Sequence, residues 1–262
     1  MKRMKVIGSP SNSKVKELIN MRNGKASDNL LLVEGLRVVE TAVNSGHPVM
    51  ELLVAEDLME RQSEKVQSLI HSRSNIIKIS HKVAKRLSDT VVPQGIFAVV
   101  EYKLKSLSEL DMSMSSIIPV IDGIQDPGNL GTIIRTADAF GIINMVVLDG
   151  SCSTSNQKVI RSSAGSLFNL NIAKTSPADF VNWAMGKGIR ILVSDSRAKK
   201  TVDKITYKGI YSVVLGNESA GADSFLKKKA DELFRIDMPG KAESLNVAIA
   251  SALIFYEFSN RN

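Results

Sequence analysis

Four turns rich in glycine and polar residues stand out in the C-terminal half of the chain, because each follows an apolar, strand-like run. These turns read GIQDPGNLGT, GSCSTSNQKVIRSSAGS, NESAGADS and GKAESLN. The first turn leads into a helix-like segment whose apolar run is interrupted by Arg135. Because Arg135 lies four residues after Gly131, its long side chain can reach back to the turn. The carboxyl ends of parallel strands meet at one edge of a sheet, where ligands bind. The spacing therefore predicts that these turns form a ligand site.

The turns lack the fingerprints of two common nucleotide sites. A nicotinamide enzyme is expected to show Gly-x-Gly-x-x-Gly directly after its first strand, with an acidic residue about 20 positions later, and this pattern is missing. The Gly-x-x-x-x-Gly-Lys-Ser/Thr sequence that cradles phosphates is missing as well. We therefore expect neither a dehydrogenase nor a P-loop nucleoside triphosphatase.

The cysteine and histidine content argues against a metal site. Cys152 is the single cysteine, which excludes an intramolecular disulfide and a zinc cluster built from cysteines. The three histidines, His47, His71 and His81, are scattered without the spacing of metal ligands. We expect no bound metal.

From residue 117 onward, apolar strand-like runs alternate with helix-like segments. Continuous runs of Val, Ile and Leu are typical of strands covered on both faces of a parallel sheet. The expected strands lie at 117–122, 144–149, 189–195 and 211–217, and the expected helices at 129–141, 162–170, 177–188, 224–232 and 243–260. This order predicts an α/β fold with a doubly wound parallel sheet.

The chain divides into two parts of different character. Residues 1–103 show a compact alternation of helix-like and strand-like runs, which predicts a smaller N-terminal α/β domain. Residues 104–116 are polar and serine-rich without sustained periodicity, as expected of a linker. The second domain is then expected to span residues 117–262.

The charge of the chain favours an anionic partner. Its formal net charge is +7 and its sequence pI is about 9.4, which makes RNA or DNA the first candidate. Lys14, Lys16, Arg22 and Lys25 fall on or beside an amphipathic helix near the N-terminus. These residues form either a nucleic-acid surface or an ordinary solvated helix face.

The sequence gives no sign of a membrane segment. It has no run of eighteen or more apolar residues, and its charged N-terminus lacks the apolar region and cleavage site of a signal peptide. We expect a soluble, cytoplasmic protein with no membrane partner.

Three segments in register resemble the signature motifs of a known enzyme family. DPGNLGTIIRTADAFG, VVLGNESAGADS and IDMPGKAESLNVAIASALIFYE resemble those of the SpoU (TrmH) family of RNA ribose 2'-O-methyltransferases, which belong to the knotted SPOUT class. The resemblance covers residues 118–258. The N-terminal half is similar to the L30e-like substrate-binding domain that many members carry.

The resemblance implies a fold, a cofactor and an assembly. S-adenosyl-L-methionine would be the methyl donor, the C-terminal domain would contain a deep trefoil knot, and the protein would be a homodimer whose active site takes residues from both chains. The apolar final helix, rich in small residues, is consistent with a dimer interface, although packing within one chain explains it equally well.

The resemblance also assigns residues to the methyl donor. These are Gly216, Ile236, Met238, Ser244 and Leu245. A glycine at 216 allows close backbone approach, whereas ordinary turn geometry is the alternative for Gly216 and Gly221. We expect Ser244 at the N-terminus of the last helix, where it could simply be a helix cap.

Four further positions match the catalytic residues of the family: Arg135, Asn129, Glu218 and Asn246. Because arginine stays protonated, we expect Arg135 to orient the target phosphate and lower the pKa of the hydroxyl, rather than to remove its proton. The alternative for Arg135 is an ion pair with Asp138 or Asp126. Glu218 could order Arg135 across a dimer interface or cap a helix that begins near Ala222.

RNA binding is assigned to four other residues. Arg161 and Ser166 lie in a segment that resembles the RNA-facing loop of the family, and Lys14 and Lys16 lie on the basic N-terminal helix.

The expected reaction is methylation of a ribose 2'-hydroxyl in RNA, with 23S ribosomal RNA as the first candidate. A tRNA substrate, base methylation, and a non-catalytic RNA-binding or ribosome assembly factor are the alternatives.

Overall fold

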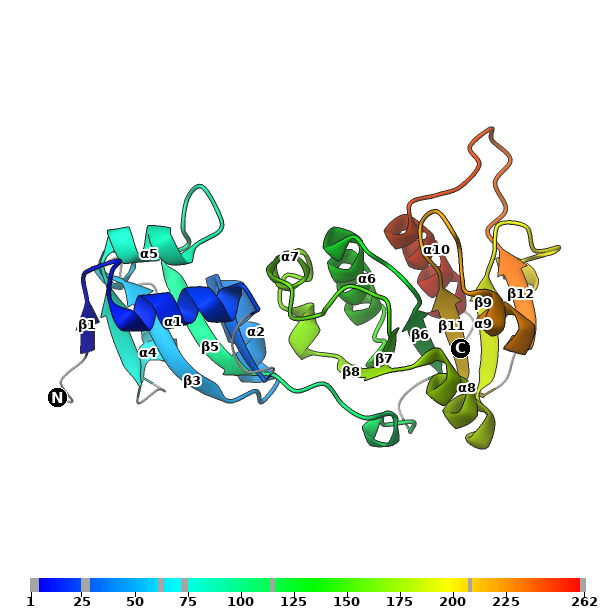
Figure 1. The fold of residues 1–262 in the computed structure, drawn as a ribbon, viewed down its shortest axis with the longest axis horizontal. Helices are drawn as coiled ribbons and strands as arrows, with labels where there is room; N and C mark the ends of the chain where they lie inside the picture. Colours follow the sequence, from blue (N-terminus) through cyan, green and yellow to red (C-terminus); the bar gives the residue numbers. More distant parts are fainter. Residues whose placement is uncertain are drawn as a thin grey trace. The chain divides into compact units, whose positions relative to one another are not determined.

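The computed structural model describes residues 5–24, 29–60, 64–71, 75–113, 116–206 and 209–259. The chain forms two compact units, which we call unit 1 and unit 2. Unit 1 comprises residues 1–103 and 155–169, and unit 2 comprises residues 104–154 and 170–262. Figure 1 labels their helices and strands.

Unit 1 is built on a five-stranded mixed sheet with the order β1-β4-β3-β5-β2. Strand β3 pairs in parallel with β4 and antiparallel with β5, which in turn pairs antiparallel with β2. The helices bury apolar side chains such as Val15, Leu18 and Val83 in its core. The elements are β1 (Lys5–Ile7), α1 (Ser13–Arg22), β2 (Leu30–Glu34), α2 (Leu36–Asn44), β3 (Val49–Ala55), α3 (Glu56–Glu60), α4 (Glu64–His71), β4 (Ile76–Ile79), α5 (His81–Leu87) and β5 (Ile96–Glu101).

Residues 155–169 pack within unit 1, whereas the sequence pattern grouped them with the second domain. Gln157 donates from Nε2 to the Leu32 carbonyl oxygen at 3.0 Å, and the His47 ring lies 5.1 Å from that of Phe168. The helix expected at 162–170 is not formed. Instead, α7 (Gln157–Ser162) is followed by a short 3-10 helix, η2 (Ser166–Phe168). Ala164 and Gly165 lie between α7 and η2, and their positive φ angles of 51° and 99° end the helix there.

Unit 2 contains a seven-stranded sheet with the order β10-β12-β9-β11-β6-β7-β8, in which the described strands pair in parallel. The parallel α/β fold expected from the sequence is therefore confirmed. Strands β8 and β10 were not anticipated, because they are short or carry polar residues. The strands are β6 (Ile117–Ile121), β7 (Asn144–Leu148), β8 (Asn171–Thr175), β9 (Arg190–Ser194), β10 (Lys200–Thr201), β11 (Tyr211–Leu215) and β12 (Glu232–Arg235).

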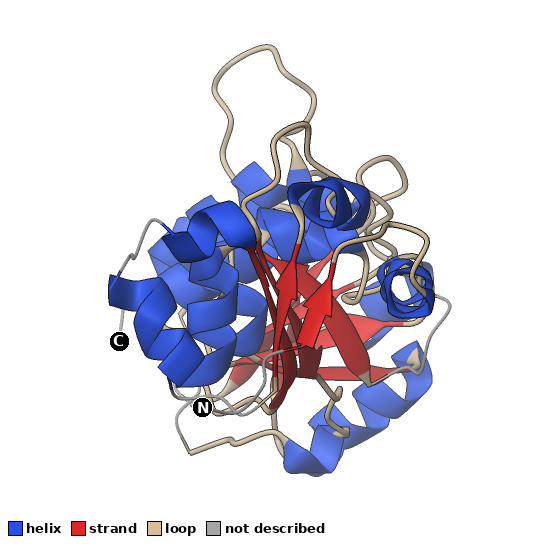
Figure 2. Ribbon diagram, turned by 90° about the vertical axis from the view of Figure 1, so that its left-hand side faces the viewer, coloured by secondary structure: helices blue, strands red, loops and turns tan. Residues whose placement is uncertain are grey.

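Helices cover both faces of this sheet, as Figure 1 shows. Helices α8 (Pro177–Gly186) and α9 (Ser224–Lys229) bury Phe180 and Leu226 in the core on one face. Helices α6 (Pro127–Ala139) and α10 (Val247–Ser259) pack against each other. The Phe258 ring of α10 contacts the rings of Tyr211 and Phe234 on the sheet. The unit therefore has three layers, with a long loop between β12 and α10 projecting from it (Figure 2).

The segment expected to be a linker is partly integrated into unit 2. The backbone N–H of Lys105 donates to the Ile172 carbonyl oxygen at 2.9 Å. Leu107–Glu109 forms the 3-10 helix η1, and Leu110 is buried in the core of the unit. Residues 114 and 115 lie outside the described residues. Leu107 and Met112 pack against the same core, so apolar side chains of this segment anchor it to unit 2.

None of the helices in the described part of the chain is both long and apolar enough to span a lipid bilayer.

Phe180→Ala is expected to lower the free energy of unfolding of unit 2 by about 3–5 kcal/mol, because it leaves a cavity at a fully buried position. Trp183, the single tryptophan of the chain, lies in the same helix, so its fluorescence during denaturant unfolding reports on this unit. The matched control is Met185→Ala, whose side chain is exposed and whose change should stay within about 0.5 kcal/mol. Equal unfolding midpoints for the two variants would contradict this packing.

Candidate active site

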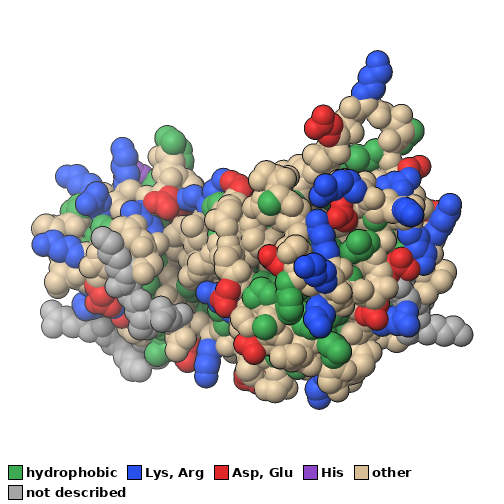
Figure 3. All heavy atoms as spheres, turned by 45° about the vertical axis from the view of Figure 1, so that its right-hand side comes forward, with side chains coloured by type: hydrophobic (Ala, Val, Ile, Leu, Met, Phe, Trp, Pro, Cys, Tyr) green, Lys and Arg blue, Asp and Glu red, His purple; other side chains and the backbone are tan. Residues whose placement is uncertain are grey.

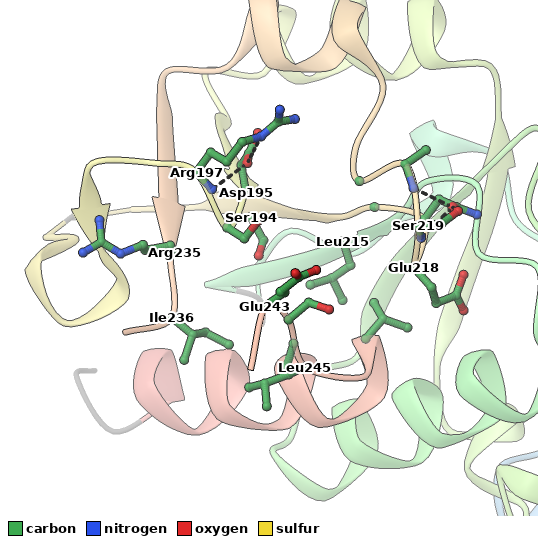
Figure 4. A pocket seen from close by; sticks show the side chains of 18 of the residues that line it. Ser194, Asp195, Arg197, Leu215, Glu218, Ser219, Arg235, Ile236, Glu243 and Leu245 are labelled. Carbon is green, nitrogen blue, oxygen red and sulfur yellow. Dashed lines mark hydrogen bonds and ion pairs between the residues drawn. The ribbon is translucent and has the colours of Figure 1, made fainter. Parts of the chain in front are cut away.

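A cavity of about 500 Å³ opens in unit 2 at the carboxyl edge of the sheet. Its walls come from the segments that follow β9, β11 and β12 and from the segment that leads into α10 (Figure 4). All five residues assigned to the methyl donor from the sequence line it: Gly216, Ile236, Met238, Ser244 and Leu245. The structure thus brings together residues that are up to 29 positions apart in the chain.

Gly216 allows two stretches of backbone to approach closely at the floor of this cavity. A Cβ atom at residue 216 would lie 2.1 Å from the Ala222 nitrogen and 2.3 Å from the Gly221 carbonyl carbon. The turn that causes this approach is closed by hydrogen bonds of 3.1 and 2.9 Å between the backbones of Asn217 and Gly221. The glycine is therefore required by close packing, beyond the needs of an ordinary turn.

Three of the expected catalytic residues form a hydrogen-bonded chain, which we call the Asn129–Glu218–Asn246 trio. Asn129 donates from Nδ2 to Glu218 Oε1 at 2.7 Å. Asn246 donates from Nδ2 to Asn129 Oδ1 at 3.0 Å. The trio links the first turn of α6, the turn after β11 and the start of α10. It thereby fixes three segments that the sequence keeps far apart.

The last helix begins later than the sequence pattern suggested. It starts at Val247, and Asn246 is its cap, because Asn246 Oδ1 accepts hydrogen bonds from the backbone of Ala248 and Ile249 at 2.9 and 3.3 Å. Ser244 is therefore not the helix cap. It lies in the exposed segment before the helix, where it lines the cavity.

Glu218 does not cap a helix either. Helix α9 begins at Ser224, and its cap is Asp223, whose Oδ1 accepts from the Phe225 backbone at 2.6 Å. Of the two roles considered for Glu218, helix capping is thus excluded by the position of α9. Its carboxylate instead holds Asn129.

Arg135 lies on an exposed face of α6, apart from the trio. Its position is six residues after Asn129, which corresponds to about 240° around the helix axis and about 9 Å along it. Among the described residues, no ion pair joins Arg135 to Asp126 or Asp138. Asp126 instead caps α6 by accepting from the Asn129 backbone at 2.9 Å. The guanidinium is therefore available to a ligand or to another chain.

Asp195 is a cavity residue that the sequence reasoning missed. It follows β9 directly, and its Oδ2 lies 2.9 Å from Lys227 Nζ. Burial raises the pKa of this carboxyl, but hydrogen bonds from Lys227 and the Arg197 backbone outweigh it and hold the pKa below its usual value. An acidic residue at the carboxyl end of a predicted strand was the available signal. It was overlooked because no motif surrounds it.

The four residues assigned to RNA binding lie in unit 1. Lys14 pairs with Glu17 and Glu51, each at 2.8 Å; burial lowers its pKa, but these hydrogen bonds raise the pKa above its usual value. Arg161 pairs with Asp89 at 3.3 Å, and Ser166 is buried. Lys16 is exposed, and Lys25 lies outside the described residues. Lys16 is thus the best placed of the four to meet a ligand.

Both units match known protein families. Residues 116–256 match the model of the SpoU rRNA Methylase family, and residues 12–98 match that of the MRM3-like substrate binding domain. The sequence is 31% identical over 255 residues to the 23S rRNA (guanosine(2553)-2'-O)-methyltransferase RlmP of Bacillus subtilis, covering 97% of this chain and 98% of the relative. It is 30% identical to the 23S rRNA (uridine(2479)-2'-O)-methyltransferase of Streptomyces viridochromogenes, covering 92% and 86%.

Solved structures resemble the whole chain. An AdoMet-bound rRNA methyltransferase from Sinorhizobium meliloti superposes with a TM-score of 0.88 at 26% identity, covering 98% of both chains. The SpoU methyltransferase AviRb from Streptomyces viridochromogenes, in complex with AdoMet, superposes with a TM-score of 0.86 at 27% identity, covering 95% of this chain and 98% of that one.

Gly216→Ala is expected to lower the free energy of unfolding of unit 2 by about 1–3 kcal/mol, because the added methyl group collides with backbone rather than with a flexible side chain. Gly186→Ala is the matched control, since a Cβ atom there meets nothing within 4 Å and the residue ends helix α8. Thermal unfolding followed by Trp183 fluorescence compares the two. Similar melting temperatures would show that the turn after β11 is not held by this close approach.

Proposed function

Because the chain belongs to the SpoU rRNA Methylase family, we propose that it transfers a methyl group from S-adenosyl-L-methionine to a ribose 2'-hydroxyl of 23S ribosomal RNA. The observation that carries this proposal is the Asn129–Glu218–Asn246 trio, formed next to a cavity lined by all five expected donor-binding residues. Both relatives compared above are named for this reaction on 23S rRNA. This favours 23S rRNA over tRNA.

The cavity fits the methyl donor in size and chemistry. Ile236, Met238 and Leu245 supply apolar side chains for an adenine ring, and the backbone at Gly216 can lie against the ligand where a side chain would block it. When bound, S-adenosyl-L-methionine supplies an electrophilic methyl group on a sulfonium. The residues of the chain hold this group and the RNA in line.

Alignment of the ribose is the role that we assign to the trio. Asn129 and Asn246 each have donor and acceptor atoms, so they can bind a ribose hydroxyl while remaining linked to each other. Glu218 fixes the orientation of the Asn129 amide through the bond at 2.7 Å. The trio would thereby hold the 2'-hydroxyl oxygen facing the methyl group of a bound donor.

Arg135 assists this step by binding the phosphate next to the target ribose. A guanidinium binds phosphate oxygens with two parallel hydrogen bonds, and its charge stabilises the developing negative charge on the 2'-oxygen. Arginine stays protonated in proteins, so it does not act as the base. Since Arg135 and the trio lie on different faces of α6, we propose that Arg135 serves the active site of a second copy of the chain.

A homodimer formed through α10 would bring Arg135 of one copy to the active site of the other. Ile249, Leu253 and Tyr256 lie on one side of α10 and are 54%, 45% and 56% exposed. Helix α6, which carries Arg135, packs against α10, and the rings of Phe140 and Tyr256 lie 6.2 Å apart. Burial of this apolar face by a second copy is favourable. We also propose that unit 2 contains the deep trefoil knot of the family.

The surface charge suits an RNA partner. Figure 3 shows lysine and arginine side chains spread over one face of unit 2 and at the tip of the loop before α10. We assign the recognition of RNA to these residues and to Lys16 of unit 1, with Arg161 in a secondary role because Asp89 already neutralises it. We propose a cytoplasmic location on the same ground, because rRNA would be the substrate. The exposed basic residues on the segments around the cavity include Arg197, Lys199, Lys228, Lys229 and Lys241.

Arg135→Ala is expected to lower methyl transfer to rRNA by roughly 100-fold to 1000-fold, since it removes a charge that stabilises the transition state. Arg135→Lys should be intermediate, because lysine keeps the charge but not the paired hydrogen bonds. The assay measures transfer of labelled methyl groups from S-adenosyl-L-methionine to RNA from cells that lack the gene. Lys187→Ala, which removes an exposed charge on another helix end, is the control. Near-normal turnover of Arg135→Lys would refute the phosphate clamp, and absence of label with the native protein would refute the proposed reaction.

Leu253→Lys is expected to convert the dimer to a monomer, because it places a charge in the apolar face of α10. Light scattering coupled to gel filtration measures the mass of each species. Met185→Lys makes the same change at an exposed apolar residue of α8 and should leave the dimer intact. A native protein that is monomeric, or a Leu253→Lys variant that stays dimeric, would contradict the proposed interface.

A further inference from the structure

Four neighbouring strands of unit 2 present different chemistry at their carboxyl ends. In the sheet they lie in the order β12, β9, β11, β6. Ile236 follows β12, Asp195 follows β9, Gly216 follows β11, and Asn129 lies at the start of the helix after β6. The methyl donor has a matching order of parts, which are the adenine, the ribose and the sulfonium with its methyl group. A donor with its adenine at Ile236 and its methyl group near Asn129 has its ribose beside β9.

The Asp195 carboxylate is held in a fixed orientation at this place. Its Oδ1 accepts a hydrogen bond from the Arg197 backbone at 2.9 Å, and its Oδ2 lies 2.9 Å from Lys227 Nζ. The loop that carries it is held in turn by Arg235, whose Nη1 donates to the carbonyl oxygens of Ala198 and Lys199 at 2.7 and 2.9 Å. Figure 4 shows Asp195 and Arg197 joined on the wall of the cavity.

The chemistry of this carboxylate suits hydroxyl groups better than a second cation. Each of its oxygens accepts one hydrogen bond from the protein and has a further lone pair for a ligand. Lys227 and the Arg197 guanidinium, whose Nε lies 3.8 Å from Oδ1, already balance the charge of this carboxylate. It therefore has little need of an ammonium group from the ligand. A pair of neighbouring hydroxyls offers two neutral donors to two adjacent acceptors.

We propose that Asp195 binds the ribose diol of the methyl donor, accepting hydrogen bonds from its 2'- and 3'-hydroxyls. This assignment rests on the proposed function, because it takes S-adenosyl-L-methionine as the ligand of the cavity. Lys227 is then a positioning residue, which orients the carboxylate without touching the diol. Asp195 makes the cavity specific for ribosides over analogues that lack these hydroxyls.

The test compares three ligands by isothermal titration calorimetry with the full chain. They are S-adenosylhomocysteine, 5'-methylthioadenosine, which lacks the amino-acid part, and the 2',3'-dideoxy form of 5'-methylthioadenosine. The native protein should bind the dideoxy form roughly 10-fold to 100-fold more weakly than its parent. Asp195→Ala should weaken the first two ligands by a similar factor and bind the dideoxy form as tightly as its parent. Asp195→Asn, which keeps the shape of the side chain, should give a smaller loss.

Glu232→Ala is the matched control, because Glu232 also pairs with a lysine, Lys200, at 2.8 Å, but is not among the residues that line the cavity. It should leave all three affinities unchanged. Equal binding of 5'-methylthioadenosine and its dideoxy form by the native protein would overturn the assignment without the need for any variant. Loss of S-adenosylhomocysteine binding alone in Asp195→Ala would overturn it too, by placing Asp195 at the amino-acid part. Failure of the native protein to bind any adenosyl ligand would instead contradict the proposed function itself.

Discussion

The backbone at Gly216 lies so close to that of Gly221 and Ala222 that a single methyl group would not fit between them. This approach folds the turn after β11 back onto the end of its own strand. Glu218 sits in that turn, and its bond to Asn129 ties the turn to α6. The bond from Asn246 to Asn129 then ties in the start of α10. A side chain at residue 216 would displace the turn and, with it, the floor of the cavity and the trio.

The trio also explains how a site made of separate loops can hold a reacting geometry. Methyl transfer requires three atoms in line, and small displacements of either reactant slow it strongly. The loops that line the cavity would each be adaptable alone, but α6 and α10 are packed helices, and the trio joins their first turns. Asn246 has two roles in this arrangement, since it caps α10 with one side-chain atom and holds Asn129 with the other. The stability of the last helix and the geometry of the site are therefore coupled.

Much of the fold could be predicted from the sequence, because unit 2 is a parallel sheet whose central strands are continuous apolar runs. The expected strands at 117–122, 144–149, 189–195 and 211–217 each contain an observed strand. The return of residues 155–169 to unit 1 could not be predicted, since it depends on contacts such as that between Gln157 and the Leu32 carbonyl. Local patterns do not encode contacts over such separations.

The sequence predicted some residues of the candidate site and missed others. The motif residues pointed to the segments that meet at the cavity, and Asn129, Glu218 and Asn246 are joined by hydrogen bonds, although their catalytic roles remain predictions. Ser244 was expected at the N-terminus of the last helix, with a helix cap as the alternative to donor binding. Asn246 is the cap instead, because helix boundaries depend on which side chain reaches the free N–H groups. Asp195 was missed, since the partner that fixes its carboxylate, Lys227, is distant in the sequence and only the folded chain brings it there.

The most direct test of the central claim is the chemical position of the transferred methyl group. RNA labelled by the protein is hydrolysed in alkali, which cleaves a linkage only where the 2'-hydroxyl is free to attack the adjacent phosphate. We predict that the label is recovered in an alkali-resistant dinucleotide derived from 23S rRNA. Label recovered in a mononucleotide with a methylated base would contradict ribose methylation and the role given to the trio.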